Sequence, residues 1–219
     1  MRQFSEYEQT ILQQILMARR DVRGNRFCRD PIDAAALEKI LQAALWAPSV
    51  GFSQPWEFVL VRDATTRAQV AAIFEAENAK ARHLFQDEKQ RQYQQLKLEG
   101  ITESALNMAV FYRPSQQPVL GQTSMPEPGE YSVVCAVQNM WLMARALNIG
   151  MGWVSILHPD AVKELLNVPE DYKLVAYLCL GYVRDFLEQP ELEILQWEQR
   201  KPLQSVLHYE SFQPAIPSD

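Results

Sequence analysis

The sequence contains none of the short motifs that identify a reaction or a bound nucleotide on their own. Its 219 residues include no Walker loop, no HExxH and no GxSxG. The segment Gly150-Met151-Gly152 lacks the third glycine of a dinucleotide-binding fingerprint and is expected to precede a strand rather than a helix. A Rossmann domain is therefore not predicted. His83, His158 and His208 do not fit a hydrolase triad, and we expect them at surface or capping positions.

Cysteine is scarce, and long apolar runs are missing. Cys28, Cys135 and Cys179 are odd in number and have no CxxC spacing, so they indicate reduced thiols rather than a disulfide frame or a metal site. The longest apolar stretch, 175–183, is too short to span a membrane. The first residues are polar and lack the apolar core of a signal peptide. We expect a soluble, cytoplasmic protein with no membrane partner.

Positive charge is also in short supply. The formal net charge of −6 argues against sequence-independent binding to nucleic acid, which needs a basic face. A phosphorylated small molecule is not excluded, because a few local arginines can outweigh a mildly acidic surface. The hydrophobic share of 47% is typical of a globular protein. No linker divides the chain, so one domain over residues 1–219 is expected.

Hydrophobic periodicity predicts strands separated by helices without a regular βαβ alternation, which favours an α+β domain. Val134, Val137, Met140, Trp141, Ala144 and Leu147 are expected on the core face of one helix. Residues 184–219 have a poor core pattern, and we interpret them as an arm that wraps a second subunit. The predicted helices cover 5–18, 33–48, 63–81, a polar stretch to 98, 131–148 and a segment opened by Pro159; the predicted strands cover 56–61, 108–112, 153–157 and 174–183.

The densest group of cations is Arg19-Arg20-Asp21-Val22-Arg23, just after the first predicted helix. Converging arginine forks suit a phosphate, since their donors bind it in pairs. A carboxylate among them should stay ionised unless it is buried, and it could act as a base. From these five residues alone, a solvated surface cluster with internal ion pairs is the more common explanation.

Three further segments carry polar or conformationally unusual residues. The loop 47–56 combines two prolines with Ser49 and leads directly into a strand, although a rigid connection would look the same. The segment 150–155 places Ser155 at a strand end. Arg200 and Lys201 precede a proline and could close a phosphate site, or form an exposed charge pair. Residues 96–101 could belong to a lid.

Taken in order, these segments resemble the nitroreductase-like flavoproteins over nearly the whole chain. The match covers the arginines after the first helix, the A-P-S…Q-P-W loop, the glycines before Trp153 and the basic residue before Pro202. Within that family, Arg19–Arg23, Leu96–Ile101, Tyr131–Asn139 and Gly152–Ser155 look like the flavin-destroying branch, the dimethylbenzimidazole synthases.

The resemblance implies a nitroreductase-like fold, with a central mixed sheet flanked by helices, and a homodimer holding FMN at two interface sites. It implies catalytic roles for Asp21, as a base near the ribityl chain, and for Ser155, as an orienting hydroxyl. The FMN-binding residues that it implies are Arg19, Arg20, Asp21, Val22, Arg23, Ser49, Leu84, Ser155 and Arg200.

The resemblance further implies that reduced FMN is a substrate, which O2 helps to fragment into 5,6-dimethylbenzimidazole and a four-carbon sugar phosphate. NAD(P)H would act only indirectly, through a separate flavin reductase that supplies reduced FMN. Two other functions remain open on this fold. One is an NAD(P)H-dependent nitroreductase or flavin reductase, and the other is a flavin-storage dimer in which Asp21 is only an ion-pair partner.

Overall fold

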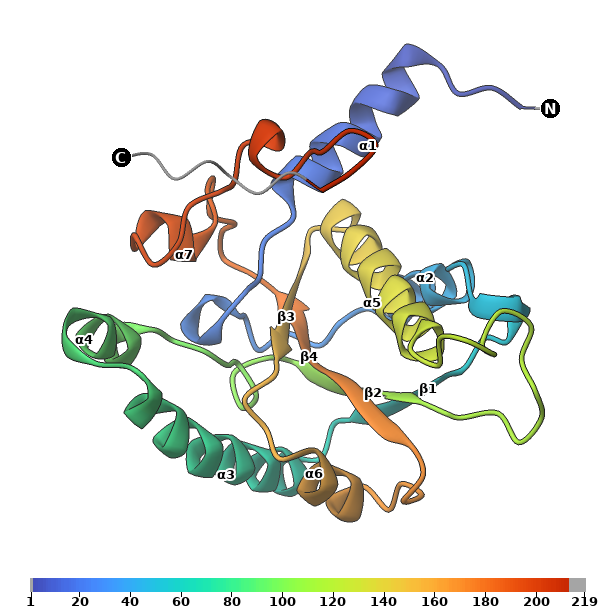
Figure 1. Cartoon of the computed structure of the whole chain (residues 1–219). Coiled ribbons are helices and arrows are strands. Elements are labelled where there is room, and N and C mark those ends of the chain that lie inside the picture. Colours follow the sequence, from blue (N-terminus) through green and yellow to red (C-terminus); the bar gives the residue numbers. More distant parts are fainter. Residues whose placement is uncertain (1, 213–219) are drawn as a thin grey trace.

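The computed structural model describes residues 2–212, in which helices cover both faces of one central sheet (Figure 1). No helix in this part of the chain combines the length and the apolar character that crossing a bilayer requires. The helices are α1 (Glu6–Ala18), α2 (Ala34–Leu45), α3 (Ala64–Ala81), α4 (Asp87–Gln95), α5 (Pro128–Ala146), α6 (Pro159–Leu165) and α7 (Glu191–Ile194); the strands are β1 (Trp56–Val61), β2 (Leu106–Tyr112), β3 (Ile149–Val154) and β4 (Lys173–Tyr182).

The sheet has the strand order β1-β2-β4-β3, and every pairing of these four strands in the described residues is antiparallel. The expectation of a mixed sheet therefore needs correction. β2 and β3 run in the same direction and are joined through α5, but β4 lies between them, so they never pair. The one parallel contact in the described chain is an isolated bridge from Asp21 to Met151. It places Asp21 at the outer edge of β3.

Alternating side chains of the two central strands fill two separate cores. Met108 and Leu178 face the core that α2 and α5 cover, whereas Phe111 and Tyr177 face the core that α3 and α6 cover. Figure 1 shows these helix pairs on opposite sides of the sheet. Because both faces are buried, β2 and β4 read as nearly continuous apolar runs. The predicted α+β arrangement, with helices flanking a central sheet, is thus confirmed.

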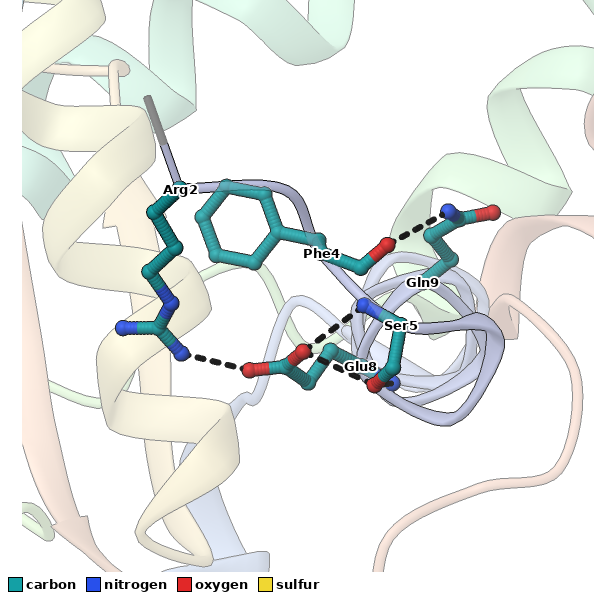
Figure 2. Close-up of polar contacts among 5 residues, drawn as sticks. All are labelled: Arg2, Phe4, Ser5, Glu8 and Gln9. Carbon is teal, nitrogen blue, oxygen red and sulfur yellow. Dashed lines mark hydrogen bonds and ion pairs between the residues drawn. The ribbon is translucent and has the colours of Figure 1, made fainter.

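Helix α1 begins with a reciprocal capping arrangement (Figure 2). The Glu8 amide donates to Ser5 Oγ at 3.3 Å, and the Glu8 carboxylate accepts from the Ser5 amide at 2.8 Å. Arg2 donates to the same carboxylate at 2.6 Å. The bonds from Ser5 and then Arg2 hold the pKa of Glu8 below its usual value. Because α1 buries no side chain of its own, these capping bonds are what stabilises its first turn. The other end of α1 leads directly into Arg19.

Two predicted boundaries were wrong around the glycine-rich segment. The strand expected over 153–157 runs over Ile149–Val154 and ends before Ser155. Gly150 and Gly152 lie inside this strand. Both positions are glycine because another part of the chain approaches the strand closely there. A Cβ at Gly150 would overlap with Val183, and one at Gly152 would overlap with the Val22 carbonyl oxygen.

Helix α5 begins at Pro128, three residues earlier than predicted, and its buried face differs by one position at its start. Val134 was expected in the core but is 39% exposed, while Val133 is fully buried. The buried stripe runs through Val133, Val137, Met140 and Ala144, which follow helical spacing. Val134 lies just beside that stripe, and the sequence alone does not distinguish the two valines.

The segment after β4 packs on the N-terminal part of the chain and on α5. Arg26 pairs with Asp185 at 3.0 Å, and the Arg145 guanidinium lies over the Phe186 ring at 4.0 Å. Beyond Pro202 its apolar side chains are exposed, including Leu203, at 64%, and Phe212, at 78%. Residues 213–219 of the predicted arm lie outside the described residues.

Candidate active site

Asp21 is held by the backbone of β3. The chain leaves α1 at Arg19 in an extended conformation and runs along the free edge of the strand, where the Val22 amide donates to the Met151 carbonyl at 3.0 Å. The Trp153 amide donates to Asp21 Oδ1 at 3.0 Å. The missing Cβ of Gly152, between these two contacts, makes the close approach possible.

This arrangement gives a first prediction. Replacing Gly152 by alanine should lower the free energy of unfolding by roughly 1–3 kcal/mol, the usual cost of overpacking a closely packed position. The added methyl group would push the Val22 carbonyl away and disturb the amide that binds Asp21. Denaturant unfolding of Gly152→Ala beside the unmutated protein measures the difference. A stability loss well below about 1 kcal/mol would contradict the packing argument.

Arg23 fixes the other side of the Asp21 carboxylate. Its Nη2 pairs with Asp21 Oδ2, and its Nη1 donates to the Leu98 carbonyl at 2.7 Å and to the Trp153 carbonyl at 2.9 Å. The Arg23 side chain is 18% exposed and that of Asp21 37% exposed. The guanidinium is therefore oriented by the protein itself, and it orients the carboxylate in turn.

Burial raises the pKa of the Asp21 carboxyl, and this cost of removing the charge from water outweighs the attraction of Arg23. Arg23, the Trp153 amide and Arg19 all act in the opposite direction, favouring the ionised form. A carboxylate that is partly desolvated yet surrounded by donors is a better base than one in water. The position suits proton transfer.

A cleft of about 710 Å³ opens beside this pair, within the range of small-molecule sites. It brings together five of the predicted site residues, from both ends of the chain. Its walls come from the end of α1, from the segment 96–98 and from the segment after β4. The lining residues are Leu16, Met17, Arg19, Arg20, Asp21, Arg23, Leu96, Lys97, Leu98, Glu188, Gln189, Pro190, Glu191, Leu192, Glu193 and Arg200.

The arginines of the cleft divide into two kinds. Arg20 is bound to backbone carbonyls, donating from Nε to Leu187 at 2.9 Å and from Nη2 to Glu188. Arg19 stacks over the Trp141 ring at 4.7 Å, and Arg200 is exposed. Within the described chain, neither the Arg19 nor the Arg200 side chain donates a hydrogen bond to protein. These two guanidinium groups can therefore bind an anion, while Arg20 holds the cleft wall.

Burial and neighbouring cations both act on the Arg20 guanidinium. Burial, followed by the nearby charges of Arg19, Arg200 and Arg145, lowers the pKa of this guanidinium. Like charges held together in this way repel one another, and an anion bound among them would relieve the repulsion. The residues present fit a phosphate group.

Four predicted site residues do not line this cleft. Ser49 Oγ accepts from the Gln54 amide at 3.1 Å within its own loop. Leu84 is 80% exposed, in a short helical turn after α3. Ser155 is exposed and directly follows β3. Val22 points into the core with 2% exposure, so only its backbone can face a ligand.

Sequence reasoning missed one wall of the cleft, which residues 188–193 form although they were interpreted only as an arm. Residues 96–101 were considered as a possible lid, and Lys97 and Leu98 do line the cleft. The contact of the Leu98 carbonyl with Arg23 could not be predicted, because a backbone carbonyl leaves no residue-type signal. Among the histidines, His158 caps α6 as expected, accepting from the Ala161 amide at 3.3 Å. No three His, Cys, Asp or Glu residues of the described chain gather as metal ligands would.

Comparison with known proteins agrees with this geometry. Residues 16–182 match the family described as the Nitroreductase family. A 5,6-dimethylbenzimidazole synthase of Rhodospirillum rubrum is 47% identical over 84% of this chain and 87% of its own length. A protein of the same name from Rhodobacter capsulatus is 38% identical over 91% of this chain and 96% of its own.

Solved structures show the same fold at lower identity. An iodotyrosine deiodinase bound to FMN and 3-iodo-L-tyrosine superposes with a TM-score of 0.73, at 21% identity, over 92% of this chain and 100% of that chain. An NADPH:FMN oxidoreductase from Vibrio harveyi superposes with a TM-score of 0.68, at 21% identity, over 94% of this chain and 79% of that chain. The chain therefore belongs to the nitroreductase family, and its sequence groups with the 5,6-dimethylbenzimidazole synthases of that family.

Proposed function

We propose that this protein is a 5,6-dimethylbenzimidazole synthase. It fragments reduced FMN with O2, releasing 5,6-dimethylbenzimidazole, the lower ligand of vitamin B12, and a four-carbon sugar phosphate. The observation that carries the proposal is the Asp21 carboxylate, fixed by Trp153 and Arg23 at the wall of a cleft that four arginines line. The synthases named above, at 47% and 38% identity, support it.

The residues of the cleft fit FMN as the bound molecule. We propose that one domain over residues 1–219 binds it. Arg19 and Arg200 would bind the phosphate, because their guanidinium groups have no protein acceptor in the described chain. Arg20 would not contact the phosphate itself, but would hold the backbone of residues 187–188 in place. The Val22 backbone and Arg23 would contact the flavin's polar atoms.

Bound reduced FMN supplies the reactivity toward O2, and the protein supplies position and proton transfer. Asp21 would accept, at a carboxylate oxygen, the proton that a ribityl hydroxyl loses as the adjacent C–C bond of that chain breaks. Arg23 and the Trp153 amide keep the Asp21 oxygens in place during this transfer. Ser155, which is exposed two residues beyond Trp153 and does not line the cleft of its own chain, would orient Asp21, a water molecule or the ring edge through its hydroxyl.

A homodimer would complete the site. Ser49 and Leu84 are predicted flavin contacts that lie outside the cleft of their own chain, so we propose that they act across the subunit interface. Exposed apolar side chains on α1 and after Pro202 provide the surface for that contact; they include Leu12, Met17, Leu203, Tyr209 and Phe212. We propose a cytoplasmic location, with reduced FMN delivered by a separate NAD(P)H-dependent flavin reductase.

Two parallel incubations separate this function from its two competitors. In both, the protein is mixed with FMN in air and total flavin is followed; one contains a chemical reductant and the other contains NAD(P)H. Loss of flavin supports the synthase. Consumption of NAD(P)H by this protein alone, with flavin conserved, supports a reductase, as the 24% identical putative NAD(P)H nitroreductase of Bacillus subtilis suggests. Binding with neither change supports flavin storage.

The phosphate site gives a second prediction. Arg19→Ala should weaken FMN binding by roughly 1.5–3 kcal/mol, the usual contribution of a hydrogen bond to a charged group. Fluorescence titration of FMN measures the change, and Arg29→Ala is the matched control, because Arg29 is exposed and does not line the cleft. Equal affinities of the two variants would remove Arg19 from the phosphate site.

A further inference from the structure

Glu99 is a buried carboxylate close to the active site that the proposed reaction does not use. Its side chain is only 9% exposed. Oε1 accepts from Lys97 Nζ at 2.5 Å, and Oε2 accepts from the Ile101 amide at 2.6 Å. A buried carboxylate without these partners would destabilise the folded state, so the two contacts are needed to keep Glu99 buried. They fold residues 97–101 into a compact loop between α4 and β2.

This loop touches the Asp21 segment at two backbone points. The Glu99 carbonyl accepts from the Gly24 amide at 2.8 Å, and the neighbouring Leu98 carbonyl accepts from Arg23 Nη1 at 2.7 Å. The contact is close, because a Cβ at Gly24, whose φ is +35°, would overlap with the Lys97 side chain. The loop is thus fitted to the backbone on which Asp21 and Arg23 stand.

These contacts form a continuous path from Glu99 to the reacting carboxylate. The Glu99 side chain sets the loop, the loop aims the Leu98 carbonyl, that carbonyl orients Arg23, and Arg23 pairs with Asp21. We infer that Glu99 is a positioning residue, which holds Arg23 against Asp21 and thereby maintains the ionised form of that base. The importance of Glu99 for catalysis rests on the proposed function, whereas its effect on the position of Arg23 does not.

Glu103 provides a matched control. It also pairs with Lys97 Nζ, at 3.0 Å, but its side chain is 31% exposed and accepts no backbone amide of the 97–101 loop. Glu103→Gln therefore removes the same charge from the same lysine without releasing the Leu98 carbonyl. Glu99→Gln loses an acceptor, because an amide nitrogen cannot accept from Lys97 or from Ile101.

The test is a carboxyl titration of Asp21 in the full-length protein without added flavin. The protein is labelled with ¹³C at aspartate carboxyls, and the Asp21 signal is identified by its loss in Asp21→Asn. In Glu99→Gln the titration midpoint of Asp21 should rise by about one pH unit or more, as expected when an opposite charge moves away. It should stay unchanged in Glu103→Gln. The charged groups that line the cleft beside Asp21 are Arg19, Arg20, Arg23, Lys97, Glu188, Glu191, Glu193 and Arg200.

Product formation from reduced FMN is measured on the same proteins. Glu99→Gln should lower kcat about tenfold or more, with FMN affinity changed less than about threefold, since Glu99 does not line the cleft. An unchanged Asp21 midpoint in folded Glu99→Gln would overturn the inference. If that variant does not fold, Glu99→Asp, which keeps the charge on a shorter side chain, must show a smaller rise, and no rise there would overturn it too. A raised midpoint in a protein whose unmutated form makes no product would refute the proposed function and leave the positioning role supported.

Discussion

Asp21→Asn should release roughly 10²–10⁴-fold less 5,6-dimethylbenzimidazole than the unmutated protein, the usual cost of losing a general base. The variant should still fold. Because burial raises the pKa of Asp21, the ionised carboxylate opposes folding above that pKa, and its contribution to stability is present only at lower pH. Removing the charge therefore relieves a cost at neutral pH. The amide oxygen can still accept from Trp153, although the amide group cannot pair with Arg23 as a carboxylate does.

The measurement is product per enzyme, beside FMN affinity for the same preparations. Asp185→Asn is the control, since Asp185 also pairs with an arginine but is 62% exposed and lies outside the cleft. In the unmutated protein the rate should fall as the pH is lowered through the Asp21 pKa, at a higher pH than an ordinary aspartate would give. Full product yield from Asp21→Asn would eliminate Asp21 as the base.

Deleting residues 184–219 should yield a protein that neither dimerises nor retains flavin. The deletion removes the cleft wall of residues 188–193 together with Arg200. It also leaves the Arg20 donors without the Leu187 and Glu188 carbonyls. FMN affinity should fall by at least the roughly 1.5–3 kcal/mol that one hydrogen bond to a charged group contributes.

A shorter deletion separates the two roles of this segment. A chain that ends at Pro202 keeps the cleft wall and Arg200 but loses the exposed apolar side chains of 203–212. It should fold with its cleft intact and dimerise less tightly. Light scattering and flavin content measure both properties. A stable dimer with full flavin content after removal of 184–219 would contradict both proposed roles.

Sequence patterns were most informative where one physical signal dominated. The strand over 56–61 was located correctly because its apolar run lies between Pro55 and the capping residue Asp63, and Asp63 does cap α3, accepting from the Thr66 amide at 2.7 Å. The strand β3 was misplaced because its two glycines look like a turn. They are required instead by contacts with Val22 and Val183, distant in the chain, which no local pattern contains.

The candidate site was predicted in part for a similar reason. The cluster from Arg19 to Arg23 could be identified because its charges are adjacent in the sequence. The different roles of its arginines could not be predicted, since Arg20 binds carbonyls 167 and 168 residues away in the chain. Glu99 gave no signal as a separate functional residue, because a charged residue in a polar stretch looks solvated. Its burial follows only from the path of the 97–101 loop.

The central claim is tested most directly by the fate of reduced FMN with the unmutated, full-length protein in air. Flavin and 5,6-dimethylbenzimidazole are quantified in the same samples over time. The proposed reaction predicts that the benzimidazole accumulates as FMN disappears, one molecule for each FMN lost. Complete recovery of oxidised FMN without any benzimidazole would contradict it.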